Sequence, residues 1–264
     1  MTAIILTLFA IKEGFMSQEI PGSVKFEELV ELISSLPDDV SLTVIGGQAL
    51  SFWVLYYQES YPEKFNAENI IIGTVDIDFL TDKRSMSICA DAWGVKLCIP
   101  DPSNVVTPQI GLLEMQLNEK PVIIDFLTDY VKPKRIKDGW LKTIPLSEER
   151  ELYILGPQAT LLSKIGNVTV LKRKDENSIG QLRAAMMVIH CAILESIDNG
   201  EKRTARRLIK FVLSISRSPR IDKPLCKLDV DLLEIIPNQL NMLDIRYVEQ
   251  SVDPEMQRVR DARN

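Results

Sequence analysis

Histidine and cysteine are scarce in this chain, and its cysteines are widely spaced. The 264 residues include a single histidine, His190, and four cysteines, Cys89, Cys98, Cys191 and Cys226. Zinc sites usually draw their ligands from closely spaced cysteines and histidines. The sequence therefore argues against a zinc centre. It predicts four free thiols in a reducing, cytoplasmic compartment.

Long apolar runs are also missing. About 20 consecutive apolar residues are needed to cross a bilayer, and no stretch of this sequence is that long. The most apolar stretch, residues 2–11, has no positively charged segment before it and no small-residue cleavage site after it. Three interpretations of residues 1–15 stay open: a membrane anchor, a buried first strand, or a stretch upstream of a true start at Met16. We expect no stable membrane association.

The net charge of −6 is divided unevenly along the chain. Residues 1–130 carry 7 Lys and Arg against 19 Asp and Glu, a net charge of −12, whereas residues 131–264 carry 24 against 18, a net charge of +6. An acidic half suits metal binding and a basic half suits contact with phosphates or nucleic acid. The alternative is that the two surfaces merely differ in charge.

Apolar periodicity predicts an α+β (α/β) fold in which a mixed sheet with flanking helices precedes a helical domain. We place the sheet domain at residues 1–150 and the mainly helical domain at residues 151–264. The predicted strands are 41–45, 74–80, 94–99, 111–118, 121–127 and 151–155, and the predicted helices are 24–36, 48–58, 158–170, 176–198, 201–217 and weaker ones within 229–250. We expect a basic loop over 132–142 and a frayed end over the last dozen residues.

Three features that can carry chemistry follow one another in the first half. A short strand runs into Gly46-Gly47 ahead of a helix, a later strand contains Asp76-Ile77-Asp78, and a further strand contains Asp125 between apolar residues. Alternate residues of a strand share a face, so Asp76 and Asp78 lie about 7 Å apart on one side. A carboxylate within an apolar strand is costly unless it is paired or bound to a metal.

These residue types suit a cation that is bound together with phosphates. Mg²⁺ takes oxygen ligands and is usually shared with substrate phosphates. Paired glycines let the backbone approach phosphate oxygens, and a helix N-terminus offers further N–H donors. The sequence therefore predicts a Mg²⁺ and nucleotide site made of Asp76, Asp78, Asp125 and the Gly46-Gly47 turn.

The segments IGGQAL, TVDIDFL and VIIDFL, in that order, resemble the DNA-polymerase-β-like nucleotidyltransferase superfamily. The pattern looks closest to the branch of abortive-infection toxins from type IV toxin–antitoxin systems. Thr74 matches the threonine before the dyad of aspartates, and the segment from Leu161 to Leu182 is similar to the branch's downstream lysine and basic cluster. The chain departs from the pattern at Gln48, where a serine is frequent, and at Ile72, where many relatives have arginine.

The resemblance implies Mg²⁺-dependent transfer of a nucleoside monophosphate from a nucleoside triphosphate to a hydroxyl of RNA, such as tRNA, or of a protein. Asp76, Asp78 and Asp125 would be the catalytic metal ligands, and Gly46, Gly47, Thr74, Lys164 and Lys174 would bind the nucleotide. A cognate antitoxin is an implied partner. The alternative is an inactive relative that binds nucleotide or acts as an interaction module.

Basic side chains and the histidine in the second half have ordinary structural interpretations as well. Lys164 stands among apolar residues, so its stem could lie along the surface with its charge in water. The cluster Lys202, Arg203, Arg206, Arg207 and Lys210 is either a charged helix face or a surface for RNA phosphates. We expect His190 to be packed in the core rather than catalytic.

Overall fold

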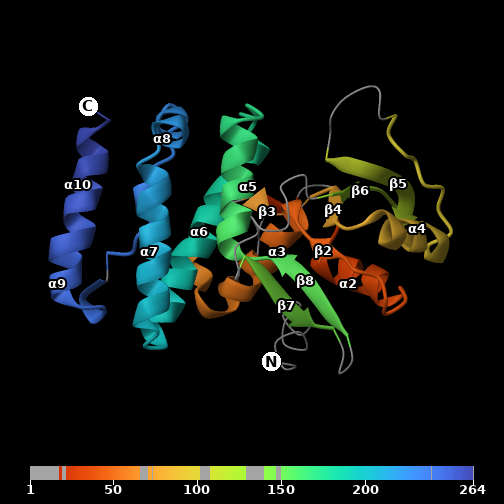
Figure 1. Ribbon diagram of the computed structural model, residues 1–264, viewed down its shortest axis with the longest axis horizontal. Helices are drawn as coiled ribbons and strands as arrows, with labels where there is room; N and C mark the ends of the chain where they lie inside the picture. The colour runs from red at the N-terminus through yellow and green to blue at the C-terminus, as the bar shows by residue number, and fades with distance from the viewer. Residues whose placement is uncertain are drawn as a thin grey trace. The chain divides into compact units, whose positions relative to one another are not determined.

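Strands between residues 43 and 155 form a six-stranded mixed sheet in the computed structural model (Figure 1). The structure describes residues 18–19, 22–65, 71–72, 74–101, 108–128, 140–146, 150–238 and 240–263. The open question about residues 1–15, and most of the basic loop predicted over 132–142, lie outside these residues. In the described part, no helix is long and apolar enough to cross a membrane.

The chain divides into two units, the first made of residues 1–56 and 71–160 and the second of residues 57–70 and 161–264. The expected α+β fold, a mixed sheet with flanking helices and a helical C-terminal region, is confirmed. The domain boundary after residue 150 stays a prediction. The strand that follows it, at residues 151–155, pairs within the sheet of the first unit.

The sheet of the first unit has the strand order β5-β6-β4-β2-β8-β7. Its strands are β2 (Thr43–Val44), β4 (Asp76–Leu80), β5 (Gln109–Leu117), β6 (Lys120–Leu127), β7 (Leu141–Pro145) and β8 (Glu151–Leu155). The pairs β4–β6 and β2–β8 are parallel and the other neighbours are antiparallel. A separate parallel pair joins β1 (Gln18–Glu19) to β3 (Ile71–Ile72).

One face of the six-stranded sheet carries its core. The fully buried side chains Val44, Ile77, Phe79, Ile124, Phe126 and Ile154 share this face, because paired residues of neighbouring strands point the same way. The opposite face of β4 and β6 is only half-buried, and Ile123 there is 45% exposed. Alternation has therefore placed one polar row of the sheet where water and solutes can reach it.

Three helices supply apolar side chains to the core of the first unit: α2 (Phe26–Ser34), α3 (Gly46–Ser60, of which residues 46–56 belong to this unit) and α4 (Lys83–Ala92). The rings of Phe26 and Phe52 lie 5.1 Å apart between α2 and α3. The indole of Trp53 donates a hydrogen bond to the carbonyl of Leu155 at 2.8 Å, which ties α3 to the end of β8. The helices predicted over 24–36 and 48–58 thus correspond to α2 and α3.

The strand predicted over residues 94–99 is wrong. Only Cys98 pairs, in an isolated bridge with Leu112. The preceding residues finish α4 instead, since the amides of Gly94 and Val95 bond to the carbonyls of Asp91 and Ala90 at 3.2 and 3.0 Å. Gly94 has a φ of +64°, which is typical of a residue that ends a helix.

The second unit is helical in its described part, apart from turns and short connections. Its long helices are α5 (Pro157–Thr169, of which residues 161–169 belong to this unit), α6 (Glu176–Asp198) and α7 (Lys202–Ser216). The remaining helices are α8 (Pro219–Cys226), α9 (Ile245–Tyr247) and α10 (Asp253–Asp261), with short 3₁₀ segments at Pro62–Lys64, Leu232–Ile235 and Leu240–Met242 and a π segment at Val248–Val252. Within this unit α7 lies between α6 and α10 (Figure 1).

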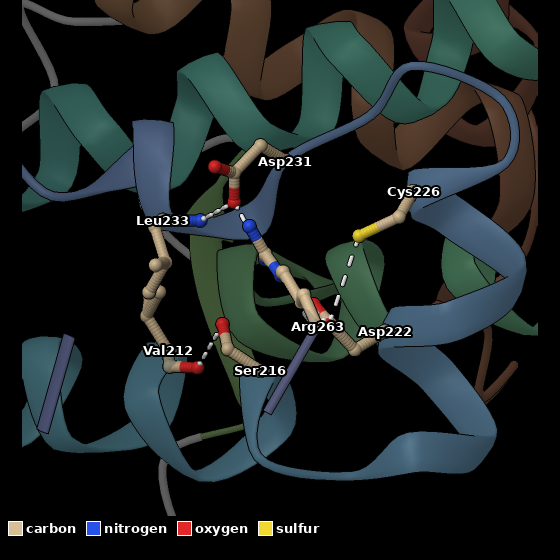
Figure 2. A network of polar contacts seen from close by, with 7 residues as sticks. All are labelled: Val212, Ser216, Asp222, Cys226, Asp231, Leu233 and Arg263. Carbon is tan, nitrogen blue, oxygen red and sulfur yellow. Dashed lines mark hydrogen bonds and ion pairs between the residues drawn. The ribbon is translucent and has the colours of Figure 1, made fainter. Parts of the chain in front are cut away.

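The end of the chain is held by a charged network, so the expected fraying of the last dozen residues is wrong. Arg263 follows α10 and makes hydrogen bonds of 2.7 and 2.9 Å to both carboxylate oxygens of Asp222, and one of 2.8 Å to Asp231 (Figure 2). The Asp222 side chain is 8% exposed and the Arg263 side chain 19%. Burial alone would raise the pKa of Asp231, but its hydrogen bond from Arg263 lowers it below the ordinary value.

We predict that replacing Arg263 by methionine destabilises the protein by about 2–3 kcal/mol, because it leaves the buried Asp222 carboxylate without its partner. Urea unfolding measures this loss. The pKa of Asp231 is depressed in the folded state, so its contribution is fully present above about pH 4 and is lost as the pH falls through the folded-state value. The difference in free energy of unfolding between Arg263→Met and the unchanged protein should therefore become smaller as the pH falls below about 4.

The matched control is Arg258→Met on α10 itself. Arg258 is paired with Glu255, but its side chain is 73% exposed, so its loss should change stability by no more than about 0.5 kcal/mol. Equal effects of the two substitutions would contradict a special role of Arg263.

Candidate active site

The three predicted carboxylates lie on the same face of two neighbouring strands. In the parallel pair β4–β6, Asp78 stands directly opposite Asp125, and Asp76 is one pleat further along β4, opposite Ile123. Neighbouring strands are about 4.8 Å apart, so Asp78 and Asp125 are adjacent on the sheet. All three aspartates are half-buried, on the face opposite the core residues Ile77 and Phe79. The sheet therefore brings these predicted residues together.

We call Asp76, Asp78 and Asp125 the acidic row. The Gly46-Gly47 bend lies against this row. Gly46 starts α3 with a φ of +65°, and a Cβ atom on it would come 1.9 Å from Oδ2 of Asp78. A Cβ atom on Gly47 would come 2.5 Å from Cβ of Thr74. The two glycines thus let the start of α3 contact β4 and the residue before it. Their predicted contact with phosphates stays a prediction.

Thr74 is bound to the dyad rather than standing apart from it. Its side chain is buried, and its hydroxyl donates a short hydrogen bond to Oδ1 of Asp76. Its backbone carbonyl accepts a 2.8 Å hydrogen bond from the amide of Val24. Thr74 therefore orients the Asp76 carboxylate. The sequence predicted Thr74 only as a nucleotide-binding residue and did not predict this contact.

Asp125 is held from the neighbouring strand β5, on the same face of the sheet. The side-chain amide of Gln109, on β5, donates a short hydrogen bond to Oδ1 of Asp125. Burial raises the pKa of Asp125 above its ordinary value; the Gln109 hydrogen bond opposes this rise and the nearby Asp76 charge adds to it. Gln109 was missed as a site residue. The signal that could have found it is Gly111 within the strand, since an isolated glycine in a strand often marks a bulge.

The donor set suits Mg²⁺, although a closed metal cage is not formed. Carboxylate oxygens are the ligands that Mg²⁺ prefers, and it is commonly held by one or two carboxylates together with substrate phosphates. Among the described residues, no group of three or more His, Cys, Asp or Glu side chains is arranged to hold a metal ion. One oxygen each of Asp76 and Asp125 is engaged by Thr74 and Gln109. The row therefore offers oxygens for a cation that substrate groups would share.

The remaining predicted nucleotide residues belong to the second unit. Lys164, on α5, is 4% exposed, and its Nζ donates a 2.8 Å hydrogen bond to Oε1 of Gln181 on α6. The interpretation of Lys164 as a surface lysine with its charge in water is therefore wrong. Lys174 is exposed, directly before Asp175, which caps α6 by accepting a 2.8 Å hydrogen bond from the amide of Ser178.

His190 lies on α6 and its ring is tied to the backbone. Its Nδ1 is 3.1 Å from the carbonyl oxygen of Ile235, and burial lowers its pKa below the ordinary value. The four cysteines are free, as expected, with Cys89 and Cys191 buried and Cys98 and Cys226 exposed. Burial raises the pKa of both Cys89 and Cys191 to about 12, which keeps these thiols unreactive.

The chain was compared with family models, curated proteins and solved structures. No protein-family model matches it, and no curated protein matches it. Among solved structures it is similar to the Megavirus polyadenylate synthase, with 9% identity and a TM-score of 0.39, over 73% of this chain and 39% of that protein. The chain thus spans well under half the length of that synthase.

We predict that alanine at Gly46 or Gly47 destabilises the protein by about 2 kcal/mol or more. Alanine at Gly46 adds left-handed strain of about 1–2 kcal/mol to a clash with the Asp78 carboxylate, and alanine at Gly47 must displace Thr74. Urea unfolding is the measurement.

Gly166 on α5 is the control, because a Cβ atom there meets nothing within 4 Å. Gly166→Ala should stabilise the protein by about 0.5–1 kcal/mol, as alanine does in a helix. Wild-type stability in Gly46→Ala would show that the bend does not press on Asp78.

Proposed function

We propose that this protein is a Mg²⁺-dependent nucleotidyltransferase that moves a nucleoside monophosphate from a nucleoside triphosphate to a hydroxyl of RNA. The observation that carries the proposal is the register of β4 and β6, which sets Asp78 beside Asp125 with Asp76 on the same half-open face. The N-terminus of α3 begins at Gly46, against Asp78, and the amides of a helix N-terminus favour anions such as phosphate.

The chain's own residues have distinct roles in this proposal. Asp76 and Asp78 would hold the cation with the triphosphate, and bound Mg²⁺ would neutralise charge on the phosphate oxygens. Asp125 would hold the cation from β6 and would also help to remove the proton of the acceptor hydroxyl, whose oxygen bonds to the α-phosphorus. The bond from the α-phosphorus to its bridging oxygen breaks, and pyrophosphate leaves with the bonding electrons. Correct positioning accounts for much of the rate in such transfers.

A basic face of α7 favours RNA over protein as the acceptor. Lys202, Arg203, Arg207 and Lys210 are exposed and make no ion pair with any described residue. Lys202 and Arg203 stand in the first turn of the helix, where positive charge opposes the helix dipole. Such placement lowers helix stability, and contact with phosphates would offset that cost.

The first test is transfer of label from each of the four triphosphates to total tRNA, with and without Mg²⁺. Asp78→Asn keeps the shape of the side chain but removes its charge, and should lower transfer by about 100-fold or more. Glu114→Gln, at an exposed position of β5, is the matched control and should transfer at the wild-type rate. Transfer that survives in Asp78→Asn would refute the proposed role of the acidic row.

The second test concerns the basic face of α7. Reversing charge at Arg203, Arg207 and Lys210 should weaken RNA binding and lower the slope of log affinity against log salt by about 2–3, because each of these side chains would neutralise one phosphate. A control triple with glutamate at Lys83, Lys96 and Lys142, exposed in the first unit, has the same change in net charge. Equally weakened binding in both triples would attribute RNA affinity to net charge and not to α7.

A second candidate function is favoured by the carboxylates that are already hydrogen-bonded. In this second function the protein would bind a nucleotide without transferring it, because Thr74 and Gln109 already engage one oxygen each of Asp76 and Asp125. Thermal shift with ATP, GTP, CTP and UTP, each with and without Mg²⁺, separates the two. A nucleotide-dependent shift without any labelled RNA or protein supports the binding module.

A further inference from the structure

A β-bulge in β5 turns Gln109 toward the acidic row. Leu112 pairs with Asp125 and Gly111 with Phe126, so a regular ladder would next set Ile110 beside Leu127. The register instead shifts, and Gln109 pairs with Leu127. Because Leu127 and Asp125 share a face of β6, the shift moves Gln109 from the core face to the face of Asp125.

Two contacts on either side of the register shift hold this part of β5 in place. A Cβ atom on Gly111 would come 2.3 Å from Sδ of Met86 on α4, so a larger residue at the bulge would have to displace the Met86 side chain. Beyond the bulge, the amide of Thr128 bonds to the carbonyl of Pro108 at 2.8 Å. These contacts fix the start of β5, and with it the Gln109 side chain, relative to β6.

The strand order decides what the Gln109 contact does to Asp125. β6 lies between β5 and β4, so Gln109 reaches Asp125 from one side while Asp78 is its neighbour on the other. The Gln109 amide donates to Oδ1, and no described residue bonds to Oδ2 of Asp125. The two oxygens of a carboxylate point apart, which leaves Oδ2 for a ligand on the far side from Gln109.

We propose that Gln109 is a positioning residue that fixes the Asp125 carboxylate so that its second oxygen serves a divalent cation shared with β4. The inference rests on the proposed function, since it concerns the cation of that same site. Hydrogen-bonded partners of ligating carboxylates orient them, and their loss typically weakens metal binding about 10–100-fold. A glutamine suits this role because its amide donates a hydrogen bond without adding charge.

The test is Mn²⁺ binding, followed by electron paramagnetic resonance of the free ion, with no nucleotide present. Gln109→Leu and Gln109→Met keep the bulk of the side chain but remove the donor, and both should bind Mn²⁺ about 10–100-fold more weakly than the unchanged protein. Gln116→Leu is the matched control, because Gln116 is an exposed glutamine on β5 and should leave the affinity unchanged.

Urea unfolding without metal accompanies each variant, so that a loss of fold is not mistaken for a loss of metal. Either folded Gln109 variant binding Mn²⁺ as tightly as the unchanged protein, or more tightly, would overturn the positioning role and leave the proposed function standing. If the unchanged protein binds no Mn²⁺, the proposed function fails and the role of Gln109 fails with it.

Discussion

Close contact between the start of α3 and strand β4 is the constraint on which the candidate site depends. Gly46 has room for the Asp78 carboxylate because it lacks a Cβ atom, and Gly47 has room for Thr74 for the same reason. Thr74 in turn holds Asp76. A larger residue in the bend would push α3 away from β4 and disturb both aspartates together. The glycines therefore shape the site through close packing, and this role does not depend on their predicted contact with phosphates.

Much of the fold follows from local periodicity, and for that reason it could be predicted. Residues 176–198 form α6 as the apolar stripe indicates, and 121–127 form most of β6. The alternation in 74–80 also places Asp76 and Asp78 on one face. What periodicity cannot provide is strand order, and Asp125 matters only because β6 is the parallel neighbour of β4. The order of the motifs predicted that Asp125 joins Asp76 and Asp78, and the pairing of β4 with β6 places the three on one face.

The missed features depend on contacts between distant parts of the chain. Gln109 reaches Asp125 through a bulge, which reverses the face that simple alternation assigns to it. Lys164 is buried because α6 supplies Gln181 as its partner, 17 residues further on. Arg263 is held by Asp222 on α8 and by Asp231, which follows it. The charged composition of the terminus had predicted a frayed end instead. In each case a polar partner at least 16 residues away in the sequence decides the outcome, and local periodicity does not identify that partner.

The electrostatics of the acidic row explain why hydrogen-bond donors surround it. Three carboxylates on one half-buried face repel one another, and removing them from water adds to the cost. The raised pKa of Asp125, caused by burial and by Asp76, is the local sign of that cost. Thr74 and Gln109 offset part of it with neutral donors, which add no charge. Because both donors are neutral, they leave the negative charges of Asp76 and Asp125 in place, whereas an ion pair with either carboxylate would cancel its charge. The proposed cation site depends on these retained negative charges.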